Sequence, residues 1–96
     1  MSSSLTHEPD ANRYVLRHGD DLVAVLDYVK RGGAISFTHT FTSPRLRGNG
    51  HAAEVVTFAV DDVEQNTDLR ILPMCWYVAE WFDQHPDRAH LLDRGR

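Results

Sequence analysis

The chain contains a single cysteine, Cys75, among its 96 residues, so no disulfide bond can form within it. It also lacks any apolar run near the roughly 20 residues that a membrane-spanning helix requires. Its N-terminal segment has neither the basic start nor the apolar centre of a signal peptide. These absences argue against a disulfide-stapled scaffold and a membrane-spanning protein, and they favour a reducing compartment. We therefore expect a cytoplasmic protein that does not associate with membranes.

Positive charge is scarce, with 10 Lys and Arg against 14 Asp and Glu and a formal net charge of -4. Because nucleic-acid-binding domains normally present a basic face, we expect no nucleic-acid partner. The chain has no H-E-x-x-H or C-x-x-C motif, so no metal site is expected. The acids concentrate at Asp61, Asp62, Glu64 and Asp68. This cluster is either a solvated helix end with its loop or an acidic lip that attracts a cationic acceptor.

Apolar residues make up 42% of the chain and charged residues 25%, which is ordinary for one globular domain with a modest core. No internal repeat or second domain is visible. We expect residues 1–11 to be a disordered lead-in, residues 12–92 to form the domain, and residues 93–96 to be a tail. The expected assembly state is a monomer or a weak dimer.

Hydrophobic periodicity and turn residues predict three strands, a helix, a fourth strand and a second helix. The pair Gly32-Gly33 predicts a hairpin turn between the second and third strands. The predicted strands are residues 12–18, 21–29, 34–41 and 69–72, and the predicted helices are residues 50–64 and 75–85, with a further helical turn over residues 87–92. This order predicts an α+β fold, in which an antiparallel β-meander is followed by a β-α-β crossover and a C-terminal helix. The aromatic pairs Trp76-Tyr77 and Trp81-Phe82 are interpreted as core packing.

The most informative segment is residues 43–53, which is typical of a loop that leads directly into a helix. Gly48 and Gly50 allow the backbone to adopt positive φ values and to approach a bulky ligand. The helix directs its free N–H groups and the positive end of its dipole at the loop. Arg45 and Arg47 add positive charge to a segment without acids. The segment therefore predicts a binding site for phosphate or pyrophosphate.

Two other interpretations of phosphate-binding loops and one structural interpretation compete with this prediction. A P-loop requires a Gly-Lys pair, which the chain lacks. Gly48, Gly50 and Ala53 satisfy the loose dinucleotide pattern, but that fold needs an acid at the end of the next strand, and Asp68 lies at the start of its strand. Alternatively, the loop only turns the chain, and the protein is an interaction domain that binds no cofactor there.

The motif R-x-x-G-x-G, formed by Arg45, Gly48 and Gly50, resembles the acetyl-coenzyme A signature of the GNAT superfamily of N-acetyltransferases. Three further segments are similar to those of a small, single-domain GNAT-like family: residues 37–40 (Phe-Thr-His-Thr), 72–78 (Leu-Pro-Met-Cys-Trp-Tyr-Val) and 82–86 (Phe-Asp-Gln-His-Pro). The resemblance covers roughly residues 12–92. It implies a minimal GNAT fold, in which the strands before and after the main helix splay apart around the pantetheine arm. It implies either acetyl transfer from acetyl-CoA to an unidentified amine, such as a protein lysine or N-terminus, or a module that binds CoA or acetyl-CoA without catalysis.

The resemblance also implies which residues hold acetyl-CoA, the cosubstrate. Backbone N–H groups of the loop would cradle its pyrophosphate, with the arginines adding charge. Backbone groups of the strand before the loop would bond the pantetheine amides. The implied cofactor-binding residues are Thr40, Phe41, Thr42, Arg45, Arg47, Gly48, Asn49, Gly50, His51 and Ala52.

Three residues are catalytic candidates, each with a structural alternative. Cys75 is expected at a helix N-terminus, where the dipole lowers a thiol pKa. It would protonate the leaving thiolate, orient the acceptor or act as a nucleophile, or it only fills the core. His39, expected to share a face with Phe37 and Phe41, is either a base or water-holder near the thioester or a satisfied core histidine. Tyr77 is a second candidate acid or a core residue.

Overall fold

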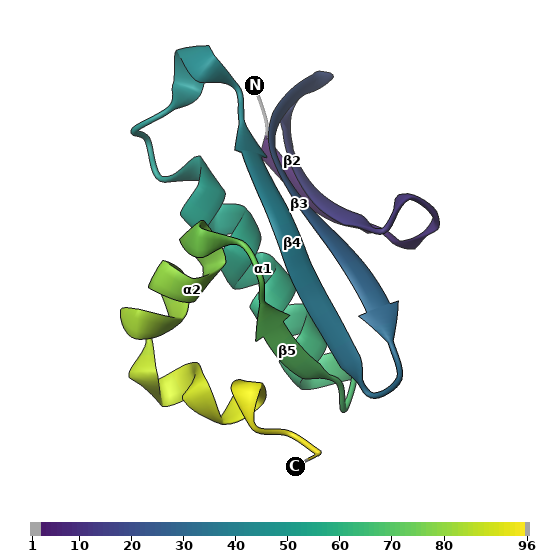
Figure 1. Cartoon of the computed structure of the whole chain (residues 1–96). Coiled ribbons are helices and arrows are strands. Elements are labelled where there is room, and N and C mark those ends of the chain that lie inside the picture. The colour runs from purple at the N-terminus through teal and green to yellow at the C-terminus, as the bar shows by residue number, and fades with distance from the viewer. Residues whose placement is uncertain (1–2, 96) are drawn as a thin grey trace.

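The structure is a computed structural model, which describes residues 3–95. It contains a five-stranded sheet in which β4 and β5 run parallel and the other neighbouring strands run antiparallel (Figure 1). The strands, in both chain order and sheet order, are β1 (Ser3–Glu8), β2 (Arg13–His18), β3 (Asp21–Arg31), β4 (Ala34–Thr42) and β5 (Arg70–Pro73). The helices are α1 (His51–Asn66) and α2 (Trp76–Asp83), with 3-10 segments η1 (Pro9–Ala11), η2 (Pro44–Leu46) and η3 (Pro86–Leu92). The predicted meander, crossover and C-terminal helix are confirmed.

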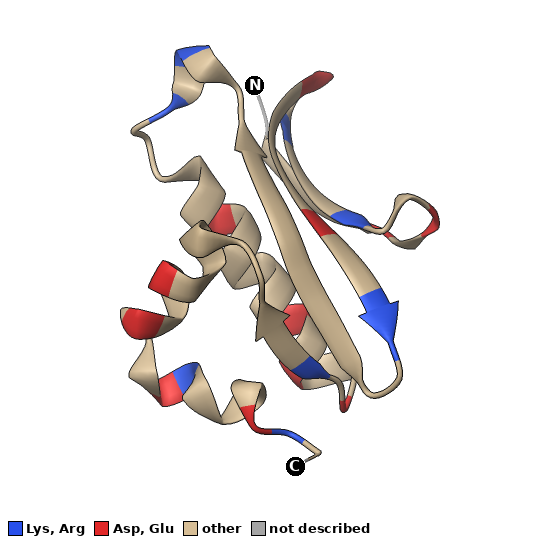
Figure 2. Cartoon of the chain, viewed as in Figure 1, with Lys and Arg blue, Asp and Glu red and all other residues tan. Residues whose placement is uncertain are grey.

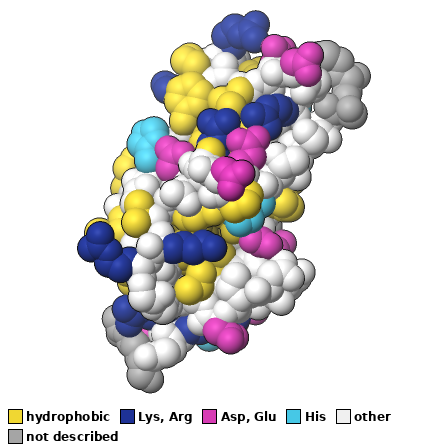
Figure 3. Space-filling view, turned by 90° about the vertical axis from the view of Figure 1, so that its right-hand side faces the viewer, with side chains coloured by type: hydrophobic (Ala, Val, Ile, Leu, Met, Phe, Trp, Pro, Cys, Tyr) yellow, Lys and Arg dark blue, Asp and Glu magenta, His cyan; other side chains and the backbone are white. Residues whose placement is uncertain are grey.

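α1 and α2 pack together on the sheet and share one hydrophobic core with it. The buried side chains of the helices follow the helical period and are Val55, Val56, Ala59, Val60, Val63, Val78, Trp81 and Phe82. Burial of the pair at 81–82 confirms its predicted packing role. Figure 3 shows the side of the molecule where β2 and β3 lie in Figure 1, on which apolar side chains are mixed with charges of both signs. Within residues 3–95, no helix is long and apolar enough to cross a membrane.

The N-terminal strand β1 is a correction to the predicted disordered lead-in. Residues 3–8 pair antiparallel with β2, and the His7 side chain holds them in place by contacts with Tyr14 and Tyr28. The His7 ring stacks on Tyr14 at 4.2 Å, and its Nε2 lies 2.6 Å from the hydroxyl of Tyr28. The Tyr14 hydroxyl in turn donates to Asp62 of α1 at 2.6 Å. These long-range contacts order a segment whose local sequence carries little strand signal, and residues 1–2 of the lead-in lie outside the described residues.

A β-bulge in β4 changes the faces that its residues occupy. Asp27 of β3 lies opposite His39, but the next residue of β3 lies opposite Phe37, so Thr38 has no counterpart. The alternation of faces is therefore reset between Phe37, which is fully buried, and His39, whose side chain is 66% exposed. The prediction that His39 and Phe41 share the face of Phe37 is wrong for this reason.

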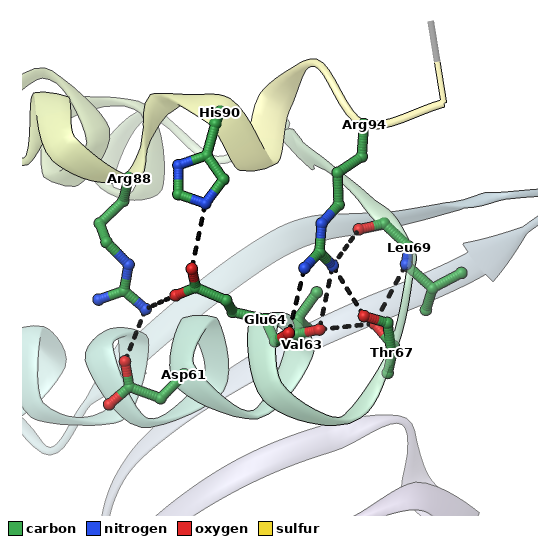
Figure 4. Close-up of polar contacts among 8 residues, drawn as sticks. All are labelled: Asp61, Val63, Glu64, Thr67, Leu69, Arg88, His90 and Arg94. Carbon is green, nitrogen blue, oxygen red and sulfur yellow. Dashed lines mark hydrogen bonds and ion pairs between the residues drawn. The ribbon is translucent and has the colours of Figure 1, made fainter.

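The C-terminal segment is fastened to the end of α1 by two arginines (Figure 4). Arg88 of η3 donates to Asp61 and contacts Glu64, each at 2.7 Å. Arg94 donates to four backbone carbonyls, those of Val63, Glu64, Thr67 and Leu69, at 2.9 to 3.3 Å. The last carbonyls of a helix lack partners within the helix, so the guanidinium caps α1. The predicted tail over residues 93–96 is therefore anchored at Arg94, and residue 96 lies outside the described residues.

Replacing this cap should weaken the fold. We expect Arg94→Ala to lower the free energy of unfolding by about 1–3 kcal/mol, because it removes a charged donor from several carbonyls at once. Arg31→Ala, at an exposed position in β3, should change it by less than about 0.5 kcal/mol. Urea unfolding followed by circular dichroism measures both. Equal, small effects would mean that water satisfies these carbonyls as well as Arg94 does.

Candidate functional site

A cleft opens where β4 and β5 separate. The two strands pair only over residues 34–37 and 70–73, although β4 continues to Thr42. At the last paired residue, the Phe37 carbonyl accepts the N–H groups of Met74 at 3.1 Å and Cys75 at 3.0 Å. Beyond this point, β4 runs toward the segment before α1 that contains Gly48 and Gly50, called the glycine loop below. The chain that leaves β5 turns into α2 instead (Figure 1). The resulting cleft has a volume of about 530 Å³.

The cleft brings together most of the predicted site residues. Its walls come from the end of β4, from the loop and first turn of α1, and from the start of α2. The lining residues are His39, Thr40, Phe41, Thr42, Arg47, Gly48, Gly50, His51, Ala52, Trp76 and Tyr77. Among the predicted residues, Arg45, Asn49 and Cys75 do not line it. Segments more than 30 residues apart in the chain therefore converge on one concave surface, as the resemblance implied.

The glycine loop has the backbone geometry that an anion site requires. Gly48 and Gly50 have φ values of 86° and 79°, in the left-handed region that favours glycine. A Cβ added to either would meet no protein atom within 4 Å, so the space above both residues is open to a ligand. Gly50 is the N-cap of α1 and has no side chain to satisfy the first N–H groups of the helix. These donors are therefore available at the edge of the cleft.

The side chains of the loop differ in whether they line the cleft. Arg47 lines the cleft, whereas Arg45 lies in the exposed η2 turn. The Asn49 side chain donates to the carbonyl of Leu46 at 3.0 Å, so it holds the loop in shape. His51, the first residue of α1, is largely enclosed, with 13% of its side chain exposed. The loop therefore offers one arginine, one imidazole and a row of backbone amides to the cleft.

Cys75 lies just behind the cleft wall, at the N-cap of α2. Its sulfur is 3.6 Å from the hydroxyl of Thr40, which lines the cleft from the opposite strand. Burial alone would raise the pKa of the Cys75 thiol. Hydrogen bonds from Thr40 and from the backbone N–H groups of Tyr77 and Val78 outweigh burial and lower that pKa. The predicted position at a helix N-terminus, with a lowered thiol pKa, is therefore present.

The other two catalytic candidates have different surroundings. Tyr77 lines the cleft, and burial, assisted by the nearby charge of Glu80, raises the pKa of its hydroxyl. It therefore stays protonated over a wide pH range. His39 lies on the outer face of the sheet, where its Nδ1 is 3.6 Å from the carboxylate of Asp27. The bulge thus leaves His39 at the rim of the cleft rather than inside the core.

Trp76 is the cleft residue that the sequence interpretation missed. Its side chain was expected in the core, but it is 74% exposed and lines the cleft. The helical period contained the signal: Val78, Trp81 and Phe82 form the buried face of α2, and Trp76 lies four residues before Glu80 on the opposite, polar face.

Among residues 3–95, no group of three or more His, Cys, Asp or Glu side chains is arranged to hold a metal ion.

Comparison with protein-family models identifies the family described as GCN5-related N-acetyl-transferase, which matches residues 13–91. No match was found among curated proteins. The matched residues include both strands that border the cleft, the whole glycine loop and α2. Membership of this family indicates acyl-CoA-dependent acetyl transfer in general. The chain therefore belongs to the GCN5-related N-acetyltransferase (GNAT) family, and its α+β architecture is a minimal GNAT fold.

Proposed function

We propose that this chain binds acetyl-CoA in the cleft between β4 and β5 and transfers its acetyl group to an amine. The observation that carries the proposal is the convergence of three features on one cleft: the free edge of β4, the open N-terminus of α1 and the low-pKa thiol next to Thr40. Each feature alone has a structural explanation. Together they supply an amide-binding edge and an anion site on one concave surface, with a proton-carrying thiol in contact with Thr40 of its lining.

The residues present fit acetyl-CoA. Gly48, Gly50 and the first turn of α1 would hold the pyrophosphate, because the space over both glycines is open, no side chain caps the first N–H groups of α1, and Arg47 adds positive charge. Thr40 to Thr42 of β4 have no strand partner on the side of β5, so their backbone groups are free to bond the pantetheine amides. The cleft volume of about 530 Å³ is in the range of cofactor sites.

Acetyl-CoA supplies an activated thioester: the reaction joins the amine nitrogen to the acetyl carbon, breaks the C–S bond, and releases the thiol and one proton. A protonated lysine amine, with an ordinary pKa near 10.4, must lose a proton before it can attack. The chain therefore needs one group or water path that accepts a proton and one that donates a proton to sulfur. Most of the acceleration would come from holding both substrates in one cleft.

Cys75 is our candidate proton donor. Its lowered pKa makes its thiol a better acid than an ordinary cysteine, and Thr40 connects it to the cleft. Tyr77, whose pKa is raised, is a protonated group in the cleft wall that can donate a hydrogen bond to the substrate. His39 points to the outer face, on which the acceptor has free access, so a role as base for the amine suits its position better than a role at the thioester.

The alternative is a module that binds CoA without transferring the acetyl group. It is favoured by the lining of the cleft, which includes no residue of β1, η1 or β2 and so offers an acceptor no further wall from these elements. Steady release of CoA thiol from acetyl-CoA in the presence of an amine, measured with a thiol reagent, separates the two functions. Saturable binding without turnover for any amine would support the module.

The pyrophosphate assignment predicts that Gly50→Val abolishes acetyl-CoA binding. A branched side chain at φ 79° is strained by about 1–2 kcal/mol and occupies the open space over the loop. We expect calorimetry to show at least about a 100-fold loss of affinity, or about 2.7 kcal/mol. Gly33→Val, in the exposed β3–β4 hairpin, should leave affinity unchanged. Wild-type protein should bind acetyl-CoA and CoA but not NAD, and retained affinity in Gly50→Val would place the pyrophosphate elsewhere.

The proton-donor assignment predicts that Cys75→Ala lowers kcat by about 100-fold while the Kd for acetyl-CoA stays the same. Cys75 does not line the cleft, so its loss should affect the proton step rather than binding. Cys75→Ser keeps a hydroxyl next to Thr40 and serves as the size-matched variant. Unchanged turnover in the alanine variant would remove Cys75 from the chemistry.

The hydrogen bonds to Cys75 predict its reactivity with pH. Because they lower the thiol pKa, the rate of alkylation by iodoacetamide should rise at a lower pH than for an ordinary cysteine. Thr40→Val removes one of these hydrogen bonds and should shift the midpoint of the rate profile upward. Since Cys75 is the only cysteine, the modification is read directly by mass spectrometry. The same midpoint in both proteins would exclude Thr40 as a source of the lowered pKa.

A further inference from the structure

Two histidines meet beside the candidate anion site, at the N-terminus of α1. His51 is the first residue of α1, and His18 is the last residue of β2. Their rings are in edge-to-face contact, with centroids 5.2 Å apart and planes at 82°. His51 lines the cleft together with Arg47, Gly48 and Gly50, whereas His18 does not line it. His18 therefore contacts an imidazole of the cleft lining without facing the cleft itself.

The His51 ring is held by two partners. One is the ring of His18. The other is Glu54, which follows one helical turn later in α1 and places its Oε1 at 3.3 Å from Nδ1 of His51. Because the ring is largely enclosed and already contacts both partners, it loses little further freedom when a ligand binds.

The contact with Glu54 decides which nitrogen of a neutral His51 carries the proton. A carboxylate only accepts hydrogen bonds, so the contact favours the tautomer with the proton on Nδ1. In that tautomer Nε2 is a bare acceptor, which repels a phosphate oxygen. The protonated ring donates from both nitrogens, so Nε2 can bond an anion while Nδ1 keeps its contact with Glu54. Contact of a phosphate with this nitrogen therefore requires the uptake of one proton.

The charges around His51 come from α1, the glycine loop and the sheet. Figure 2 shows basic residues on the segment before α1 and acidic residues on α1 itself. Glu54 favours the protonated ring, and Arg47 opposes it but attracts the same anion. In the sheet, His18 adjoins the ring, and Asp21 lies opposite His18 in the register of β2 and β3. A bound pyrophosphate adds negative charge beside the ring, and a nearby opposite charge favours the charged form of a titratable group.

Two other titratable side chains line the cleft. Burial raises the pKa of the Tyr77 hydroxyl, so this group exchanges no proton near neutral pH. His39 comes from β4 and pairs with Asp27, so it belongs to neither the glycine loop nor α1. The proton coupled to the anion site is therefore assigned to His51.

We propose that His51 binds the pyrophosphate of acetyl-CoA through Nε2 in its protonated form, and that His18 positions the His51 ring. The inference rests on the proposed function, to which it adds a binding residue, a positioning residue and a proton. Histidine ordinarily titrates near pH 6.5, and a bound anion extends its protonated form to higher pH. The complex then carries more protons than the free protein, so affinity for the cosubstrate should fall as pH rises through the neutral range.

The test is a calorimetric titration with dephospho-CoA, which keeps the pyrophosphate but lacks the phosphate monoester of CoA. That monoester titrates near pH 6 and would add protons of its own. Titrations in two buffers of different ionisation enthalpy, neither of them a phosphate, give the number of protons taken up on binding. We expect the wild type to take up about half to one proton near pH 7 and to lose about tenfold in affinity between about pH 6 and pH 8.

Four variants assign the proton and the positioning role. His51→Gln keeps an amide donor but no titratable ring, so its affinity should not depend on pH and it should take up no proton. His18→Ala removes the ring contact and should weaken binding about threefold, whereas His18→Phe restores an aromatic ring and should retain wild-type affinity and proton uptake. His90→Gln is the matched control, because His90 forms a similar contact with Glu64 at 3.1 Å and does not line the cleft.

The outcomes distinguish this inference from the proposed function. Proton uptake that disappears in His51→Gln and persists in His18→Phe and His90→Gln supports it. Binding without proton uptake in the wild type, or uptake that survives in His51→Gln, overturns it and leaves the proposed function standing. Equal affinities of His18→Ala and His18→Phe would overturn the positioning role. If neither acetyl-CoA nor dephospho-CoA binds between about pH 6 and pH 8, the proposed function itself fails, and His51 has no pyrophosphate to bind.

Discussion

The bulge at Thr38 is the constraint on which the rest of the site depends. An extra residue increases the local twist of a strand and bends it. The pairing of β4 with β5 ends at Phe37, one residue before the bulge. The same residue resets which side chains face inward. Thr40 turns toward Cys75, whereas His39 turns to the outer face beside its partner from β3. In a strand without the bulge, His39 would lie on the same face as the buried Phe37.

The contacts that fasten the C-terminal segment and the candidate cleft lie at opposite ends of α1. At one end, Arg88 and Arg94 fasten the C-terminal segment to the last turns of α1, close to the paired part of β4 and β5 (Figures 1 and 4). At the other end, the N-cap of α1 is Gly50, which has no side chain, so no side chain caps the N–H groups of the first helical turn. A helix that is capped at its C-terminus can leave its N-terminus unsatisfied for a ligand, because the shared core holds its position.

Most of the fold was predictable, because its signals are local. Alternation, the Gly32-Gly33 turn and the glycine loop predicted the strands from β2 onward, both helices and the crossover, and the loop motif predicted one whole wall of the cleft. The failures share a different cause. β1 is held by ring stacking and hydroxyl contacts of His7 with residues far along the chain, and the orientation of His39 depends on a bulge that no residue type marks. Trp76 was misassigned because its neighbour Tyr77 packs inward, although the polar face of α2 was visible in the helical period.

An acidic chain can offer a site to an anionic cosubstrate only where positive charge is concentrated locally. The net charge is -4, yet the segment before α1 carries two arginines and no acid, and the dipole of α1 adds to them. Exposed charges are screened beyond about 8–10 Å at physiological salt, so the acids of α2 do not cancel the field at the loop. The two ends of the cleft can therefore attract ligands of opposite charge at the same time. In the proposed binding mode, the acids of α2 would repel phosphate groups, so this charge pattern favours a pyrophosphate at the loop before α1 over one at α2.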